Sequence, residues 1–91
     1  MQHDLTIKQR YLIRLLTGEK KVEIRLNDRD FQVMDTIRFL PLEGGGYNVC
    51  DYLNEARGLG ACVPKFNITY VHSGLGMAEG WVALSVEEVP E

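Results

Sequence analysis

The 91-residue sequence predicts a small α+β domain, a mostly antiparallel β-barrel of five to six strands with one early helix and room for a second short one. Two observations carry this prediction. One stretch near the start has apolar residues at helical spacing, and several short runs with apolar residues at every second position follow it. A chain of this length supports one core, so we expect residues 1–91 to form a single domain.

The expected elements can be placed along the chain. Strands are predicted, in order, over residues 5–7, 21–26, 36–40, 47–50, 66–72 and 81–86. The helix is predicted over 9–17, because Gly18 can adopt the positive φ that ends a helix. A second, short helix is predicted over 51–57, where Asp51 suits the first turn and Gly58 follows the last. Pro41 should limit the strand before it.

The strand at 21–26 contains the best candidate for a site. Its alternation puts Val22 and Ile24 on one face, which we expect in the core, and Glu23 and Arg25 on the other, which we expect in a cleft. The two charged side chains start roughly 7 Å apart along the strand, and Lys20 precedes them. This pattern suits the binding of a small polar or anionic ligand, although a structural ion pair is the alternative.

Charge and cysteine content restrict the function classes. The net charge of −3 argues against indiscriminate nucleic-acid binding. Eight of the ten Lys and Arg residues nevertheless fall in residues 1–40, so a basic face in the first half could still meet phosphate. Two cysteines are too few for a disulfide scaffold, so we expect a reduced, cytoplasmic protein. No apolar run approaches the roughly 20 residues of a membrane helix, so we expect no membrane partner.

Four motifs carry a resemblance to a known family. They are His3-x-Leu5-x-Ile7, Gly18-x-Lys20-x-x-Glu23-x-Arg25, Asn27-Asp28-Arg29-x-Phe31-x-Val33-x-Asp35 and Gly80-Trp81-Val82-Ala83-Leu84-Ser85. With them the chain resembles an ASCH domain of the PUA-like superfamily, and within it a small bacterial and phage-associated family of unknown function. The resemblance covers residues 3–40 and 66–87. Met34 stands where that family usually has glycine, and Thr6 stands where a lysine is common.

The resemblance implies a pseudo-barrel with a cleft beside the first helix, and ligand contacts from Lys20, Glu23, Arg25 and Arg29. Relatives with this fold bind RNA, and one bacterial ASCH group hydrolyses the amide of acetylcytidine. That group is similar to this chain at Lys20, but it has a threonine nucleophile where this chain has Glu23. A carboxylate can act as a general base on water, yet it cannot replace a hydroxyl that forms an acyl intermediate.

Three functions therefore remain open. The first is a module that binds RNA or a nucleotide weakly through Lys20, Glu23, Arg25 and Arg29. The second is a small amidohydrolase that uses Lys20 and Glu23 on an acylated nucleoside. The third is a protein-interaction module. We rank binding first and lean against an enzyme. We expect no cofactor, and the sequence leaves the oligomeric state open.

Two further groups of residues contain side chains that can form sites. We expect no metal site, because Cys50, Cys62, His3 and His72 lack the spacing of zinc ligands. Among the aromatic residues, Tyr11, Tyr70 and Trp81 are expected to pack the core, whereas Tyr47 and Tyr52 are better placed for stacking on a base.

Overall fold

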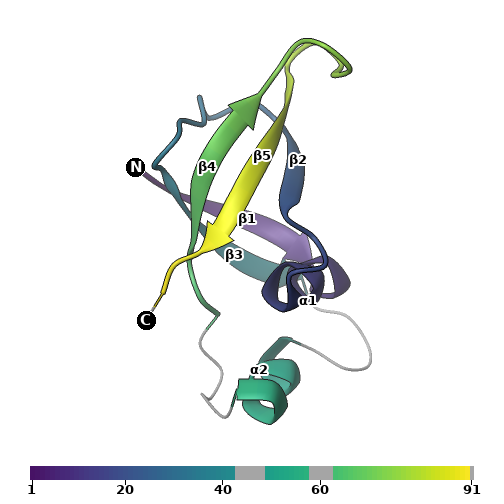
Figure 1. Ribbon diagram of the computed structural model, residues 1–91, viewed down its shortest axis with the longest axis vertical. Coiled ribbons are helices and arrows are strands. Elements are labelled where there is room, and N and C mark those ends of the chain that lie inside the picture. Colours follow the sequence, from purple (N-terminus) through teal and green to yellow (C-terminus); the bar gives the residue numbers. More distant parts are fainter. Residues whose placement is uncertain (43–48, 58–62, 91) are drawn as a thin grey trace.

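The computed structural model describes residues 1–42, 49–57 and 63–90 (Figure 1). Its elements are β1 (Gln2–Lys8), α1 (Gln9–Thr17), β2 (Val22–Leu26), β3 (Thr36–Leu42), α2 (Val49–Arg57), β4 (Phe66–His72) and β5 (Trp81–Glu88). The five strands form one sheet in the order β1-β3-β4-β5-β2. The predicted α+β class with one early and one short second helix is confirmed.

The sheet curls into a half-barrel whose two edges are β1 and β2. β2, β5 and β4 run side by side, and β1 and β3 cross behind them (Figure 1). β2–β5, β4–β5 and β3–β4 pair antiparallel, whereas β1 and β3 pair parallel. No backbone ladder joins β1 to β2 among the described residues, so the barrel is open at this seam.

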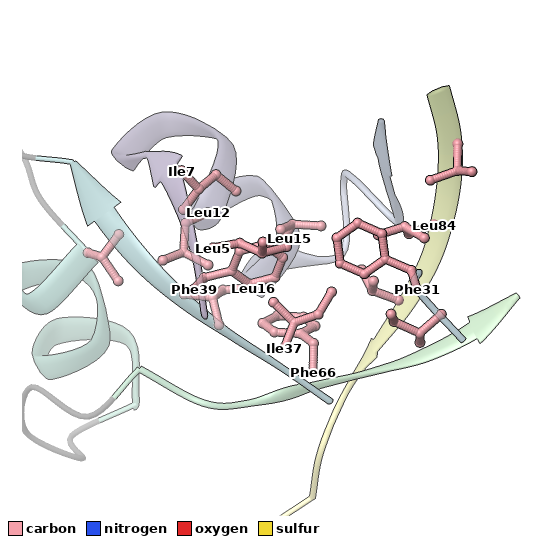
Figure 2. Close-up of a cluster of buried hydrophobic side chains, with 14 of the residues drawn as sticks. Leu5, Ile7, Leu12, Leu15, Leu16, Phe31, Ile37, Phe39, Phe66 and Leu84 are labelled. Atoms are coloured by element: carbon pink, nitrogen blue, oxygen red, sulfur yellow. The ribbon is translucent and has the colours of Figure 1, made fainter. Parts of the chain in front are cut away.

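α1 matches its predicted bounds. Its buried face consists of Leu12, Leu15 and Leu16, and Gly18 ends it with φ 83° while its N–H donates to Leu15 O. In Figure 2 these leucines point toward side chains from the strands, among them Phe39 and Phe66. The two phenylalanine rings meet edge to face with centroids 5.5 Å apart. The core therefore fills the space between α1 and the concave face of the sheet.

α2 begins two residues before the predicted short helix, so the prediction of a strand over 47–50 is wrong at Val49 and Cys50. Residues 47 and 48 lie outside the described part of the chain. Gln9, the first residue of α1, fixes this start. Its Oε1 accepts from Val49 N at 2.9 Å, and its Nε2 donates to Leu42 O at 3.0 Å. A helix N-terminus has backbone N–H groups without intrahelical partners, and Gln9 satisfies one of them.

β3 continues through Pro41 to Leu42, so the expectation that the proline limits this strand is wrong. Thr36 N donates to Met1 O, which means that alternate residues from Thr36 onward direct their backbone groups toward β1. Pro41 belongs to the other set, which faces β4. Within the described part of the chain, pairing with β4 involves Thr36 and Ile37, so the missing N–H of Pro41 breaks no rung of the ladder that is described.

The strand β2 alternates as predicted, but the prediction that Val22 and Ile24 lie in the core is wrong. Ile24 is 59% exposed and Val22 is 38% exposed, whereas Glu23 is 5% exposed. The reason is the position of β2 at the edge of the curled sheet. Its inner face looks into the open seam, where the charged side chains lie, and its apolar side chains look outward.

None of the described helices is long and apolar enough to cross a membrane.

Candidate functional site

The open seam between β1 and β2 forms a cleft with a volume of about 930 Å³. The start of α1, the turn after β2 and the first residue of β5 complete its walls. Five cationic and three acidic side chains line it: Lys8, Arg14, Lys20, Arg25 and Arg29, with Glu19, Glu23 and Asp28. The four predicted site residues all lie here, in a locally cationic part of an acidic protein.

Glu23 is the centre of the site. Its carboxylate binds a different cation at each oxygen, with Lys20 Nζ 3.1 Å from Oε1 and Arg25 Nε 3.0 Å from Oε2. Lys20 also donates to the Val22 carbonyl. Because Glu23 is buried and its partners are partly buried, the carboxylate holds both cations in fixed positions at the cleft wall. The structure thus brings together three of the predicted residues.

Two arginines bridge the seam to the free edge of β1. Arg25 Nη2 donates to Thr6 O at 2.8 Å, and Arg29 Nη1 donates to Asp4 O at 2.6 Å. These carbonyls point away from β3, since alternate residues of β1 bond to it. Arg29, the fourth predicted residue, therefore lines the same cleft without joining the Glu23 cluster. Arg25 is held at two points, and its Nη1 has no hydrogen-bond partner within the described ranges.

Sequence reasoning missed two aromatic residues of the cleft. Trp81 was expected in the core but is 42% exposed, and it lines the cleft. Tyr11 packs against the core, as expected, and it lines the cleft as well. Trp81 opens β5 opposite Leu26, so it belongs to the outward set of side chains at the rim. Two cations flank Tyr11, with Lys8 Nζ 5.9 Å and Arg10 Cζ 4.9 Å from the ring centroid. Val82, Leu84 and Val86 of β5 point into the core, so Trp81, one position before Val82, belongs to the opposite face. This alternation is the signal in the sequence that could have placed Trp81 outward.

The remaining tyrosines lie outside the cleft or outside the described residues. Tyr70, also expected in the core, is exposed on the outer face of β4. Tyr52, a candidate for stacking, packs against the core from α2. Tyr47 lies outside the described residues.

Outside the cleft, His3 and Asp35 form a buried pair. His3 Nε2 lies 2.8 Å from Asp35 Oδ2, which also accepts from Gln32 N at 3.0 Å. These bonds, that of His3 above all, together with the N-terminal ammonium of Met1, lower the pKa of Asp35 to about 2. Within the described ranges, no three His, Cys, Asp or Glu side chains gather as metal ligands.

Comparison with solved structures finds proteins of the same fold. The crystal structure of hypothetical protein PH0355 matches with a TM-score of 0.58 at 19% sequence identity, and the match covers 98% of this chain and 100% of that one. A comparison with curated proteins finds no match. The family described as "Domain of unknown function (DUF3850)" matches residues 2–86. The chain therefore belongs to the DUF3850 family.

Proposed function

We propose that this domain is an RNA-binding or nucleotide-binding module of the ASCH, PUA-like type, and that the cleft between β1 and β2 is its ligand site. The Gly-x-Lys-x-x-Glu-x-Arg segment that carries the resemblance to ASCH domains lines this cleft from Glu19 to Arg25. The proposal joins that resemblance to the chemistry of the cleft.

The observation that carries the proposal is the orientation of Arg25. A guanidinium has five N–H donors in a planar fork. Glu23 holds Nε and Thr6 O holds Nη2, so the fork is fixed before a ligand arrives while Nη1 remains available. A fixed fork binds a phosphate or the edge of a base with little further loss of side-chain freedom.

The aromatic residues supply the second part of a nucleotide site. Bases stack on exposed aromatic side chains, which contributes about 1–3 kcal/mol per base. Trp81 and Tyr11 line the cleft together with Lys8 and Arg14, so cations for phosphate lie on the same surface as rings for bases. The overall acidity of the chain limits non-specific attraction, so we propose weak binding, with Kd on the order of 10⁻⁶ M or higher.

Fluorescence anisotropy with labelled short single-stranded RNA and DNA, at several salt concentrations, tests this function. Arg25→Ala should weaken RNA binding by about 1–3 kcal/mol if the fork binds a base edge. Trp81→Ala should weaken it by a similar amount through lost stacking.

The chain offers a matched control for each variant. Arg38→Ala removes the same charge at an arginine that does not line the cleft and instead pairs with Asp4, with Nη2 2.6 Å from Oδ2. Tyr70→Ala removes an exposed ring from the outer face of β4. Both controls should leave binding within a factor of two of wild type. Equal affinity for wild type, Arg25→Ala and Trp81→Ala would show that this cleft binds no nucleic acid.

A further inference from the structure

The edge of β1 that borders the cleft has a backbone donor without a partner. Thr36 N donates to Met1 O, so Met1 and every second residue after it, including Leu5, bond to β3. Thr6 belongs to the other set and lines the cleft, so its N–H and C=O point away from β3. The Thr6 carbonyl accepts from Arg25, but its N–H has no hydrogen-bond partner in the described part of the chain.

Two guanidinium groups lie on either side of this N–H. Along the free edge of β1, the Thr6 N–H falls between the Asp4 and Thr6 carbonyls. Arg29 Nη1 donates to the first carbonyl at 2.6 Å, and Arg25 Nη2 donates to the second at 2.8 Å. Two strand residues separate the carbonyls, a distance of roughly 7 Å. Two fixed cations therefore flank one backbone amide.

The groups that remain available at this place are all donors. Arg25 Nη1, Arg29 Nη2 and Thr6 N have no hydrogen-bond partners among the residues that the structure describes. The acceptors beside them are engaged, since the arginines bind the two carbonyls and the Glu23 carboxylate binds Lys20 and Arg25. A matching ligand must therefore accept at several atoms and carry negative charge.

Phosphate fits this set of donors better than the edge of a base. A phosphate presents several acceptor oxygens, whereas guanine is the base whose major-groove edge has two acceptors and no donor. Five cations against three acids leave the cleft two positive charges in excess, which matches the charge of about −1.5 to −2 on a phosphate monoester at pH 7. The Asp28 carboxylate is exposed and lies 3.7 Å from Arg29 Nε, so it offsets part of this charge without binding Nη2.

We propose that Thr6 N–H, Arg25 Nη1 and Arg29 Nη2 form a phosphate subsite on the β1 edge of the cleft. The inference deepens the proposed function and rests on it for the source of the phosphate, which is a nucleotide or RNA. It assigns Arg25 to phosphate rather than to a base edge. The rings of Trp81 and Tyr11, which line the same cleft, are then left to stack on bases.

Titration of the full ¹⁵N-labelled chain with inorganic phosphate, followed by NMR at pH 7 and constant ionic strength, tests the subsite. The Thr6 amide signal should shift to saturation with Kd on the order of 10⁻³ M, as expected for so small a ligand. Arg29→Ala should weaken phosphate binding about tenfold. Arg38→Ala is the matched control and should change it by less than about twofold, because Arg38 bonds to the Asp4 carboxylate and does not line the cleft.

Two variants of Thr6 isolate the backbone donor. Thr6→Pro removes the N–H, and an edge strand tolerates proline where this group lies outside the ladder. Thr6→Ala keeps the N–H and removes only an exposed side chain. Phosphate binding should fall about tenfold in Thr6→Pro and stay at the wild-type level in Thr6→Ala. If Thr6→Pro does not fold, Arg29→Ala decides, because Arg29 is exposed and takes no part in the Glu23 cluster.

Nucleotides and RNA identify the source of the phosphate. Guanosine 5′-monophosphate should bind about tenfold more tightly than guanosine, the nucleoside whose base has the two acceptors. An RNA with a 5′-phosphate that binds more tightly than the same RNA without it would assign the subsite to a terminal phosphate. Equal binding of the two RNAs, each with a shift of the Thr6 amide, would assign it to an internal one.

Three results would overturn the subsite. They are a Thr6 amide that phosphate does not shift, an Arg38→Ala variant as impaired as Arg29→Ala, and guanosine that binds as tightly as its monophosphate. RNA that binds without shifting the Thr6 amide would also overturn it, but would leave the proposed function intact. Phosphate binding at Thr6 without affinity for RNA or nucleotides would support the subsite and contradict the proposed function.

Discussion

The Nε2 atom of His3 lies 2.8 Å from Oδ2 of Asp35, and both side chains are buried. The pair fastens β1 to the turn before β3, and the His3 ring also meets Phe31 edge to face at a centroid distance of 4.8 Å. Three donors surround the Asp35 carboxylate, so its charge stabilises the fold and takes no part in the cleft.

Asp35 should make folding stability depend on acid pH. Its pKa is about 2 in the folded protein against an ordinary value of 3.8, so the stabilisation is fully present above about pH 5 and is lost as pH falls from about 4 to 2. The shift corresponds to about 2 kcal/mol. We expect Asp35→Asn to lower the free energy of unfolding by about that amount at pH 7 and by little at pH 2.

Urea unfolding of both proteins across this pH range measures the difference. Asp28→Asn is the control, because the Asp28 carboxylate is exposed and lies 3.7 Å from Arg29. Its difference from wild type should be small at every pH. A difference between wild type and Asp35→Asn that is the same at pH 7 and pH 2 would contradict the assignment.

Met34 should be a position where glycine stabilises the protein. Its φ is 78°, in the left-handed region, and its side chain is exposed. That conformation costs an L-residue about 1–2 kcal/mol, and glycine avoids this cost at the expense of greater freedom in the unfolded chain. We expect Met34→Gly to raise the free energy of unfolding by about 0.5–1 kcal/mol, measured by urea denaturation.

Asp30 provides the comparison for Met34. Its φ is 50°, but aspartate tolerates this region better and the Asp30 carboxylate accepts from Gln32 Nε2 at 2.9 Å. Asp30→Gly should therefore give no gain. If Met34→Gly instead lowers the free energy of unfolding, the methionine side chain stabilises the protein by more than its strained backbone destabilises it.

If the domain were the alternative amidohydrolase, it would hydrolyse acetylcytidine, and we expect no such activity. Both oxygens of Glu23 bind cations, and the chain has a carboxylate where the ASCH enzymes that its sequence resembles have a hydroxyl nucleophile. Incubation of wild-type protein at high concentration with acetylcytidine should release no product above background. Product that disappears in Glu23→Gln but persists in Glu19→Gln, an exposed acid of the same cleft, would establish the hydrolase instead.

Glu23→Gln should also destabilise the fold. A neutral amide can accept from only one of the two cations, and its own NH₂ group would then face the other. We expect a loss of about 1–3 kcal/mol in the free energy of unfolding. Glu19→Gln should change it by less than about 0.5 kcal/mol, because Arg14 lies 4.0 Å away and both side chains are exposed.

The sequence pattern correctly predicted those elements whose structure depends mainly on residues close together in the chain. The apolar spacing before Gly18 predicted α1 to the residue, and the alternation in β5 correctly placed Val82 and Leu84 inside. The same alternation in β2 predicted two faces but not which one is buried. That depends on where the strand lies in the sheet, and a strand at an open seam reverses the usual assignment.

Long-range pairing explains the remaining differences. The parallel partnership of β1 with β3 joins residues more than thirty positions apart and has no turn signal between them. It determines where Pro41 is tolerated, and it places Thr6 O within reach of Arg25. The cluster of Lys20, Glu23 and Arg25 was predictable because it lies within six residues, whereas Trp81 reached the cleft only through the fold.

Gln9 makes one side chain responsible for how three elements meet. Its amide group holds the end of β3 at Leu42 and the start of α2 at Val49, while its own backbone begins α1. A single substitution at this position would therefore loosen a junction of three elements at once, rather than one local contact.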